Sequence, residues 1–403
     1  MCDAFFAALE AAITACTNPN TEKSIKSAAD QLKVIQANGH YTDTVLSKLV
    51  NLEALILMVI ATENTGPSYD QKSVWISLAV DAATTMKLHH PPRLNDPNDL
   101  DSYTRGDLGR RAWLILFILD RWHAMGESDM LRVAEDSCKL VDHDRVLMSE
   151  GPYHLFRKFL KTLSLLNSSI NRPLLGLSRI MGHLSRGFVF HSDELVAPPS
   201  KGGLLNEAIE GELELFRESV HQDFAKMPSI HLAYLHVKNV ADRYLNVYAM
   251  NTGAVVDGAF RIVALLRHTK GIYCAPWIHH IIMLAARTLE QVADLELHPD
   301  AIAALHDLRD DLDTSLFRFH KEKTAWDIAI SAMIAKKLNG GSQAFGTEGA
   351  VDRGGLGQLA DAAVGKTDAS NGVGTSGTSH GIGTSTSPKW SLLTTRGYLT
   401  TLE

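Results

Sequence analysis

The sequence predicts an all-α protein: a large multi-helical domain with a disordered C-terminal tail rich in Gly, Ser and Thr. Apolar residues recur at intervals of three and four through most of the first 340 positions, as they do along the buried face of a helix. No convincing run of alternating β-branched residues lies between hairpin turns, which is the pattern of a strand. With 403 residues, 45% of them hydrophobic, the chain can bury a substantial core.

The helical pattern falls into separate segments, and prolines and glycines divide several of them. The clearest break is HHPPRLNDPND at residues 89–99, because proline cannot donate a backbone N–H and restricts the residue before it. Asn18-Pro19, Pro198-Pro199 and Gly202-Gly203 mark other loops. In order, the expected helices cover about 3–16, 22–37, 42–63, 71–88, 106–127, 154–169, 204–225, 229–250, 254–269, 275–296, 298–318 and 322–338.

We divide the chain into three parts. Residues 1–339 form the expected helical domain. Residues 340–388 are dominated by Gly, Ser, Thr, Ala and Asp, and such a segment cannot bury enough apolar surface to offset its ordering entropy, so it is expected to be disordered. Residues 389–403 regain apolar side chains, among them Trp390, Tyr398 and Leu399. This last segment is either a short partner-binding segment or an artefact of the gene model.

Composition excludes several classes of protein. The 46 acidic and 39 basic residues give a formal charge of −7, so the chain lacks the basic footprint of a protein that grips phosphate backbones. Its four cysteines contain no CxxC pair, which argues against a disulfide framework and a zinc module. The longest apolar runs, Ala54–Ala61 and Ala112–Leu119, are about half the length that spans a bilayer, so no transmembrane helix is expected. Asp3 stands where a signal peptide has a basic residue, and an intracellular protein is expected.

The best enzymatic signal is HDLRDDLD, which places Asp307, Asp310 and Asp311 at helical spacing on one face. Three such carboxylates could hold magnesium on a diphosphate, as in an isoprenoid-type enzyme. The order departs from DDxxD, and no second magnesium motif follows on another helix. A solvated acidic face flanked by Arg309 and Arg318 is the preferred interpretation.

Histidines give no metal or catalytic motif. The pairs His89-His90 and His279-His280 are adjacent residues that point about 100° apart on a helix, so neither pair alone is expected to chelate a metal. HExxH is absent, and no nucleophile sits in a diagnostic turn. Sequence spacing does not reveal whether some of the 18 histidines cluster in space, and ordinary core or surface positions explain these histidines equally well. No catalytic, cofactor-binding or metal-binding residue is therefore assigned.

Charges bracket an apolar run in RRAWLILFILDRWHAMG, residues 110–126. Apolar side chains cover nearly all sides of this expected helix, so it should be a central core helix. Its charges must then be paired, since an uncompensated buried charge would cost several kcal/mol. We expect Arg111 and Arg121 to reach carboxylates on neighbouring helices and Asp120 to reach a neighbouring arginine.

The same stretch resembles the middle homology region of fungal zinc-cluster transcription factors. The family signature is a basic pair, a tryptophan and an apolar run that ends in Asp-Arg. The corresponding residues here are Arg110, Arg111, Trp113, Asp120 and Arg121. The Gly-Arg-Pro turn that usually follows in the family is replaced by GESDMLRV.

Two further blocks precede this stretch in the family's order. SVWISLAVDAATTMKLHHPP is similar to a family helix that carries a tryptophan and ends in Leu-His, and LVNLEALILMVIATENTGP is similar to its leucine-rich first helix. In the former block Trp75, Ala79, Ala83, Leu88 and His89 occupy the corresponding places. The segments DRWHA and NTGAVVDGAFRIVALLRHTKG look closest to the glucose-responsive regulators of hexose-transporter genes. The resemblance is good over 49–166 and weaker to about 338.

The resemblance implies a non-enzymatic regulatory module that acts in the nucleus on genes of sugar transport or carbon metabolism. Expected partners are protein co-regulators or a second transcription factor subunit, and a homodimer is possible. The six-cysteine zinc cluster through which this family binds DNA is not among these residues. A truncated form of a DNA-binding factor is the first expectation. No cofactor and no membrane association are expected.

Overall fold

The computed structural model describes residues 2–18, 21–37, 44–67, 71–91, 100–134, 168–191, 202–220, 223–245, 252–269, 277–314, 323–342 and 397–399. Within these residues no strand occurs, which confirms the predicted all-α class. The helices are α1 (Cys2–Thr17), α2 (Glu22–Ala37), α3 (Val45–Asn64), α4 (Lys72–Thr85), α5 (Leu100–Glu127), α8 (Ser168–His191), α9 (Gly202–Val220), α10 (Pro228–Leu245), α11 (Thr252–His268), α12 (Ile278–Asp294), α13 (Ala301–Asp313) and α14 (Ala325–Ser342).

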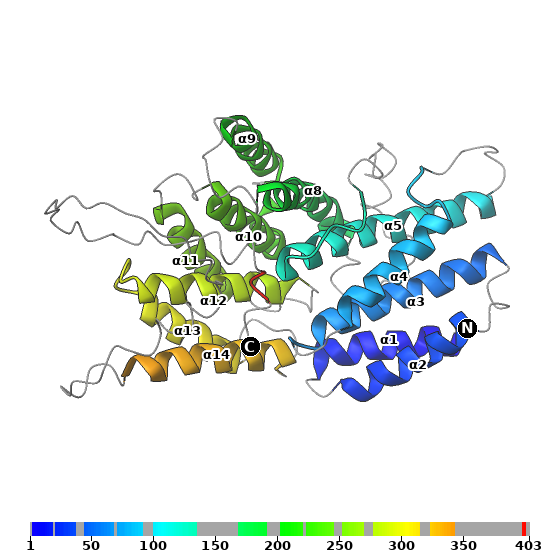
Figure 1. Ribbon diagram of the computed structural model, residues 1–403, viewed down its shortest axis with the longest axis horizontal. Helices are drawn as coiled ribbons and strands as arrows, with labels where there is room; N and C mark the ends of the chain where they lie inside the picture. Colours follow the sequence, from blue (N-terminus) through cyan, green and yellow to red (C-terminus); the bar gives the residue numbers. More distant parts are fainter. Residues whose placement is uncertain are drawn as a thin grey trace, which may run out of the picture.

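The helices form two groups that share one core. α1 to α4 lie together at one end of the molecule, and α10 to α14 lie together at the other (Figure 1). α5 runs from the first group towards α12, so that its C-terminal end reaches the second group (Figure 1). One cluster of buried apolar side chains extends from Ala4 in α1 to Ile334 in α14 and includes Leu399 near the C-terminus. The N-terminal and C-terminal helices are therefore stabilised by the same apolar burial.

α3 is a long, strongly apolar helix. The side chain of Thr44 caps its N-terminus by accepting a hydrogen bond from the backbone N–H of Ser47 at 3.1 Å. Its length and apolar composition would allow α3 to cross a membrane, although the sequence led us to expect no such helix. In the protein, 61% of the most apolar 18-residue stretch of α3 is buried. Core helices meet the same criteria, and α3 packs against α1, α4 and α5.

The prediction that α5 is a central core helix is confirmed. Every residue from Ala112 to Gly126 is buried. The charges in this stretch are paired, but not all in the way we expected. Arg121 donates from Nη1 to Oδ2 of its own neighbour Asp120 at 3.0 Å, and its guanidinium lies 3.6 Å from the ring centroid of Phe117. Asp120 also accepts the backbone N–H groups of Arg132 and Val133 at 3.1 and 3.0 Å, so it fixes the segment that follows α5.

One helix was not predicted. α8 was assigned to no helix, because Pro173 and nearby Asn171 lower the helical signal at its start. Beyond Pro173 its apolar spacing is regular, since Leu174, Leu177, Met181 and Leu184 are all fully buried. Most of the expected helix at 154–169 and most of the tail at 340–388 fall outside the described residues; residues 168–169 belong to α8 and residues 340–342 to α14.

The segment 389–403 is described only at residues 397–399, and these residues are buried in this same chain. Tyr398 and Leu399 are 0% and 2% exposed. The backbone N–H of Leu399 donates to the carbonyl of Gly126, the last buried residue of α5, at 3.1 Å. This contact brings the C-terminal segment to the place where α5 meets α12.

Candidate functional site

A group of polar side chains lies in the core where α5 meets α12. We call it the histidine cluster, and each member is at most 3% exposed. Glu63 comes from the end of α3, His123 from α5, His236 from α10, and an adjacent pair from the first turn of α12. The members are Glu63, His123, His236, His279, His280 and Tyr398.

The strongest contact in the cluster joins Glu63 to His123. His123 Nδ1 lies 2.6 Å from Glu63 Oε1, and its Nε2 lies 3.0 Å from Ser73 Oγ, which donates to Asp129 Oδ2 at 3.0 Å. Burial alone would lower the pKa of His123, but the carboxylates of Glu63, Asp129 and Glu127 outweigh it and raise the pKa to about 9. Burial alone would raise the pKa of Glu63, but the contact with His123 holds it well below its usual range. Near neutral pH the pair is an imidazolium and a carboxylate.

The second oxygen of Glu63 faces the histidine pair of α12. Glu63 Oε2 lies 3.7 Å from His279 Nε2 and 3.8 Å from His280 Nε2, which is too long for a hydrogen bond. Among the described residues Glu63 Oε2 and both ring nitrogens of His279 have no hydrogen-bond partner. The His279 ring stacks on Trp326 of α14 at a centroid distance of 4.5 Å. The indole of Trp326 in turn donates to the backbone carbonyl of Glu63 at 2.7 Å, so α3 and α14 meet here.

The C-terminal tyrosine connects the remaining two histidines. Tyr398 Oη lies 3.0 Å from His280 Nδ1 and 3.1 Å from His236 Nε2. Burial lowers the pKa of His280, of His236 and of His279, the last to about 3. The three imidazoles are therefore neutral near pH 7, and each has one ring nitrogen that can accept a hydrogen bond or bind a metal.

Glycine is required beside His280. A Cβ atom on Gly126 would lie 2.4 Å from His280 Cε1 and 2.7 Å from Leu399 Cδ1. Gly397 has a φ of +81°, and a Cβ there would lie 2.7 Å from the carbonyl carbon of Glu127. The end of α5 and the C-terminal segment thus approach each other more closely than side chains allow.

Sequence reasoning missed most of this cluster. It noted His279 and His280 only as a pair that should not chelate a metal alone, and it did not single out Glu63, His123 or His236. No clear signal was present in the sequence, because Glu63 stands in the polar run TENT at the end of an apolar stretch and His123 closely follows the charged pair Asp120-Arg121. Their partners lie 60 and more than 200 positions apart in sequence, so spacing could not reveal them.

The predicted signature residues lie on α4, α5 and the loop after α4. Arg110 is 1% exposed and donates to the backbone carbonyl of His89 at 2.6 Å. The His89 ring lies 5.7 Å from that of Trp113, and Trp75 is buried on α4. Arg111, which neighbours Arg110, is half-buried. The contacts of Arg110 and Trp113 with His89 join two blocks of the sequence.

The three aspartates of α13 do not converge. Asp307 pairs with Arg267 of α11 at 2.6 Å, and the same arginine lies 3.5 Å from Asp311. Asp310 is exposed and lies 3.5 Å from its neighbour Arg309. Because basic side chains neutralise all three carboxylates, the arrangement gives no support to a magnesium-dependent site.

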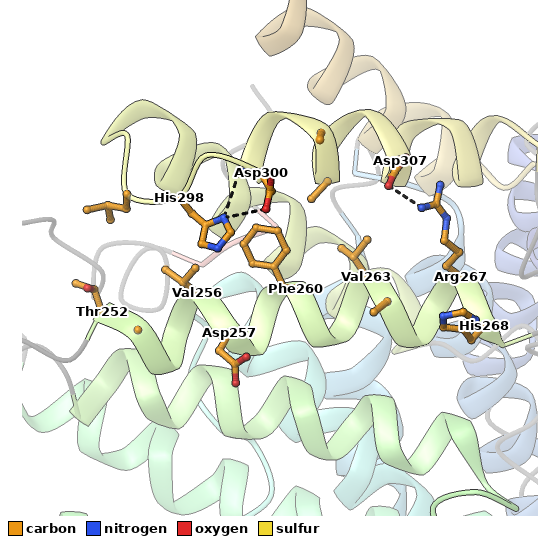
Figure 2. A pocket seen from close by; sticks show the side chains of 15 residues that line it. Thr252, Val256, Asp257, Phe260, Val263, Arg267, His268, His298, Asp300 and Asp307 are labelled. Atoms are coloured by element: carbon orange, nitrogen blue, oxygen red, sulfur yellow. Dashed lines mark hydrogen bonds and ion pairs between the residues drawn. The ribbon is translucent and has the colours of Figure 1, made fainter.

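A surface groove of 710 Å³ lies between α11 and α13. Figure 2 shows Val256 and Phe260 of α11 directed towards it, with His298 opposite and the Arg267–Asp307 ion pair at one end. The rings of Phe260 and His298 lie 4.6 Å apart. No member of the histidine cluster lines the groove, so the described residues show no connection between the groove and the cluster.

The chain was compared with known proteins. No protein-family model matches the chain, and no solved structure matches it. The chain is 27% identical over 305 residues to an uncharacterized transcriptional regulatory protein of Schizosaccharomyces pombe. The match takes in 73% of this chain and 32% of the relative, so it spans about a third of the length of that protein.

Proposed function

We propose that this chain is a non-enzymatic regulatory module of a transcription regulator. The observation that carries the proposal is the similarity to the transcriptional regulatory protein of Schizosaccharomyces pombe, which extends over 305 residues. This similarity extends over more residues than the segment 49–166 that resembles the zinc-cluster family. Most signature residues of α4 and α5 are buried, namely Trp75, Arg110, Trp113, Asp120 and Arg121, which fits motifs that stabilise the fold of the module.

A catalytic role has little support among the described residues. The aspartates of α13 are paired with arginines, and the histidine cluster is closed by Tyr398 and Leu399. Substrate would need a path to these groups, and the groove between α11 and α13 is lined by Asp307, which is paired with Arg267, and by no member of the histidine cluster. This supports the proposal that the module works by binding partners.

We further propose that the module acts in the nucleus and controls genes of sugar transport and carbon metabolism. Its partners are protein co-regulators or a second transcription factor subunit, including a second copy of the chain. With a formal charge of −7 the module itself is poorly suited to bind DNA. DNA contact is therefore assigned to a zinc cluster outside these 403 residues.

A tethering experiment tests this proposal. The chain is fused to an unrelated DNA-binding domain and expressed in yeast with a reporter gene that carries the matching sites. We expect reporter transcription to change relative to the DNA-binding domain alone, and to change again when glucose is added. A reporter that responds to the fusion but not to glucose would leave transcription regulation standing and reject the sugar-responsive role. A reporter that does not respond to a folded fusion would reject the regulatory function.

Two variants sharpen the experiment. Asp120→Ala removes a buried carboxylate that fixes the segment after α5, so it should weaken the reporter response by destabilising the module. Asp307→Ala changes a half-exposed carboxylate on α13 and should leave the response intact. Loss of the response in the Asp307→Ala variant would instead point to a function of the α13 surface.

A further inference from the structure

We propose that Glu63, His279 and His280 form a binding site for one divalent transition metal ion of the zinc class. The ligand atoms are Glu63 Oε2, from the end of α3, and Nε2 of each histidine, from the first turn of α12. This inference is independent of the proposed regulatory function.

The ligand atoms are arranged as a metal site requires. One ligand atom from each of the three residues lies within 4.8 Å of the other two. Glu63 Oε2 is 3.7 Å from His279 Nε2 and 3.8 Å from His280 Nε2. Zinc binds nitrogen and oxygen at about 2.0–2.2 Å in tetrahedral geometry, which separates its ligands by about 3.3 Å. Each Glu63–histidine distance would close with a shift of roughly half an ångström, and the two histidine nitrogens, which lie within 4.8 Å of each other, would approach by at most about 1.5 Å.

Unsatisfied polar atoms point to a missing ligand. Within the described part of the chain, Glu63 Oε2 and His279 Nε2 have no hydrogen-bond partner. Both side chains are more than nine-tenths buried, and Glu63 is ionised. Buried polar groups in native proteins are almost always satisfied, and an unpartnered buried carboxylate oxygen calls for a cation or a water molecule. A metal ion between Glu63 and the two imidazoles satisfies these atoms at once.

The protonation states suit a metal ligand set. His279 and His280 are neutral near pH 7 because burial lowers the pKa of each. Neutral imidazole is the form that binds metal, so no proton has to be displaced. Lys72 is paired with Glu127 at 3.2 Å, and His123 contacts the first oxygen of Glu63, Oε1, at 2.6 Å. Glu63 is thus able to share its second oxygen with an ion.

Residues around the three ligands orient them. If Nε2 of His280 binds the metal, its Nδ1–H donates to Tyr398 Oη, and the tyrosine hydroxyl donates to His236 Nε2. His123 holds the other oxygen of Glu63, and Trp326 fixes the plane of the His279 ring by stacking. The set of two histidines and one glutamate is typical of zinc and leaves a fourth position for water.

A cobalt titration tests the site. The full chain, without a polyhistidine tag, is stripped with a chelator and titrated with Co²⁺, whose visible absorption reports tetrahedral coordination. We expect one Co²⁺ per chain, displaced by an equal amount of Zn²⁺. Glu63→Gln and His279→Gln should each abolish this binding. Tyr398→Phe removes only an orienting contact and should weaken it about 10–100-fold.

His183→Gln is the matched control. His183 also lies beside a carboxylate, at 3.0 Å from Glu212, but its side chain is 27% exposed and the pair lies on α8 and α9. This variant should bind Co²⁺ as the unaltered chain does. Circular dichroism shows whether each variant is folded. If Glu63→Gln and His279→Gln do not fold, X-ray absorption of the cobalt-loaded unaltered chain decides, with two imidazoles and oxygen expected as ligands.

Two results would overturn the proposal. One is an unaltered, folded chain that takes up no Co²⁺ or Zn²⁺ beyond weak binding by exposed histidines. The other is binding by different ligands, shown either by stoichiometric binding that persists in folded Glu63→Gln and His279→Gln variants or by a ligand set without imidazole.

Discussion

Glu63 on α3 and Asp307 on α13 are both carboxylates beside a basic side chain, but they lie in opposite surroundings. Glu63 has a side chain that is 5% exposed and a partner, His123, that is 1% exposed. Asp307 is 45% exposed, and Arg267 opposite it is 43% exposed. The contact distances are the same, at 2.6 Å. Distance alone therefore does not distinguish the two pairs.

The two pairs differ in whether water can reach them. At the surface, solvent replaces a lost partner, so exposed ion pairs contribute little to stability. In the core nothing replaces it, and removal of one partner leaves a charge in a medium of low polarisability. The two regions should then respond very differently to the same substitution. The expected effects below run from the largest to the smallest.

Glu63→Ala should have the largest effect. It leaves the His123 imidazolium buried without its closest carboxylate and removes the group that faces His279 and His280. We expect the free energy of unfolding to fall by about 3–5 kcal/mol, the usual result of breaking a buried pair. Urea denaturation followed by circular dichroism measures it. A loss under about 1 kcal/mol would show that the cluster is solvated.

Asp120→Ala should follow, with a loss of about 3 kcal/mol, because Arg121 is left without its closest carboxylate and two backbone N–H groups lose their acceptor. The cation–π contact of Arg121 with Phe117 remains and limits the loss. Thermal melting of this variant beside Asp120→Asn, which keeps the shape, tests the point. Unshifted melting in both variants would contradict the buried-pair explanation.

Gly126→Ala should lower stability by about 2 kcal/mol, because the added methyl group collides with His280 and Leu399. Gly211→Ala on the exposed side of α9 is the matched control, because nothing lies within 4 Å of its Cβ position. Alanine there should raise stability by about 0.5–1 kcal/mol through helix propensity. Equal shifts for both variants in urea denaturation would be inconsistent with the close approach of α5 and α12.

Tyr398→Phe should cost about 1 kcal/mol, since His280 and His236 each lose a hydrogen-bond partner while the ring still fills its space. The C-terminal segment should also detach more readily. Hydrogen exchange at the Leu399 amide, which donates to Gly126, measures this directly. An unchanged exchange rate would mean that packing alone holds the segment.

Asp307→Ala should have the smallest effect. Both members of its pair are about half exposed, so water takes the place of the lost carboxylate. The melting temperature should stay within experimental error of the unaltered chain. A clear drop would mean that the contacts of Arg267 with Asp307 and Asp311 hold α11 to α13.

The same contrast explains what could be predicted from the sequence. Helix class and most helix positions follow from local apolar spacing, as the close agreement at α2 shows, and α8 was missed where Pro173 interrupts that spacing. The motif HDLRDDLD suggested a magnesium site because its carboxylates are close in sequence. In the structure these carboxylates lie at the surface or beside an arginine. The histidine cluster brings together four helices and the C-terminus, and only tertiary packing places Glu63 beside His279.

The most direct test is a pair of double-mutant cycles, one on Glu63 and His123 and one on Asp307 and Arg267, measured by urea denaturation. For the buried pair we predict a coupling free energy of about 1–3 kcal/mol. For the exposed pair the coupling should not be resolved from zero. Equal coupling in both cycles, or none at Glu63 and His123, would contradict the view that the histidine cluster is the polar centre of the fold.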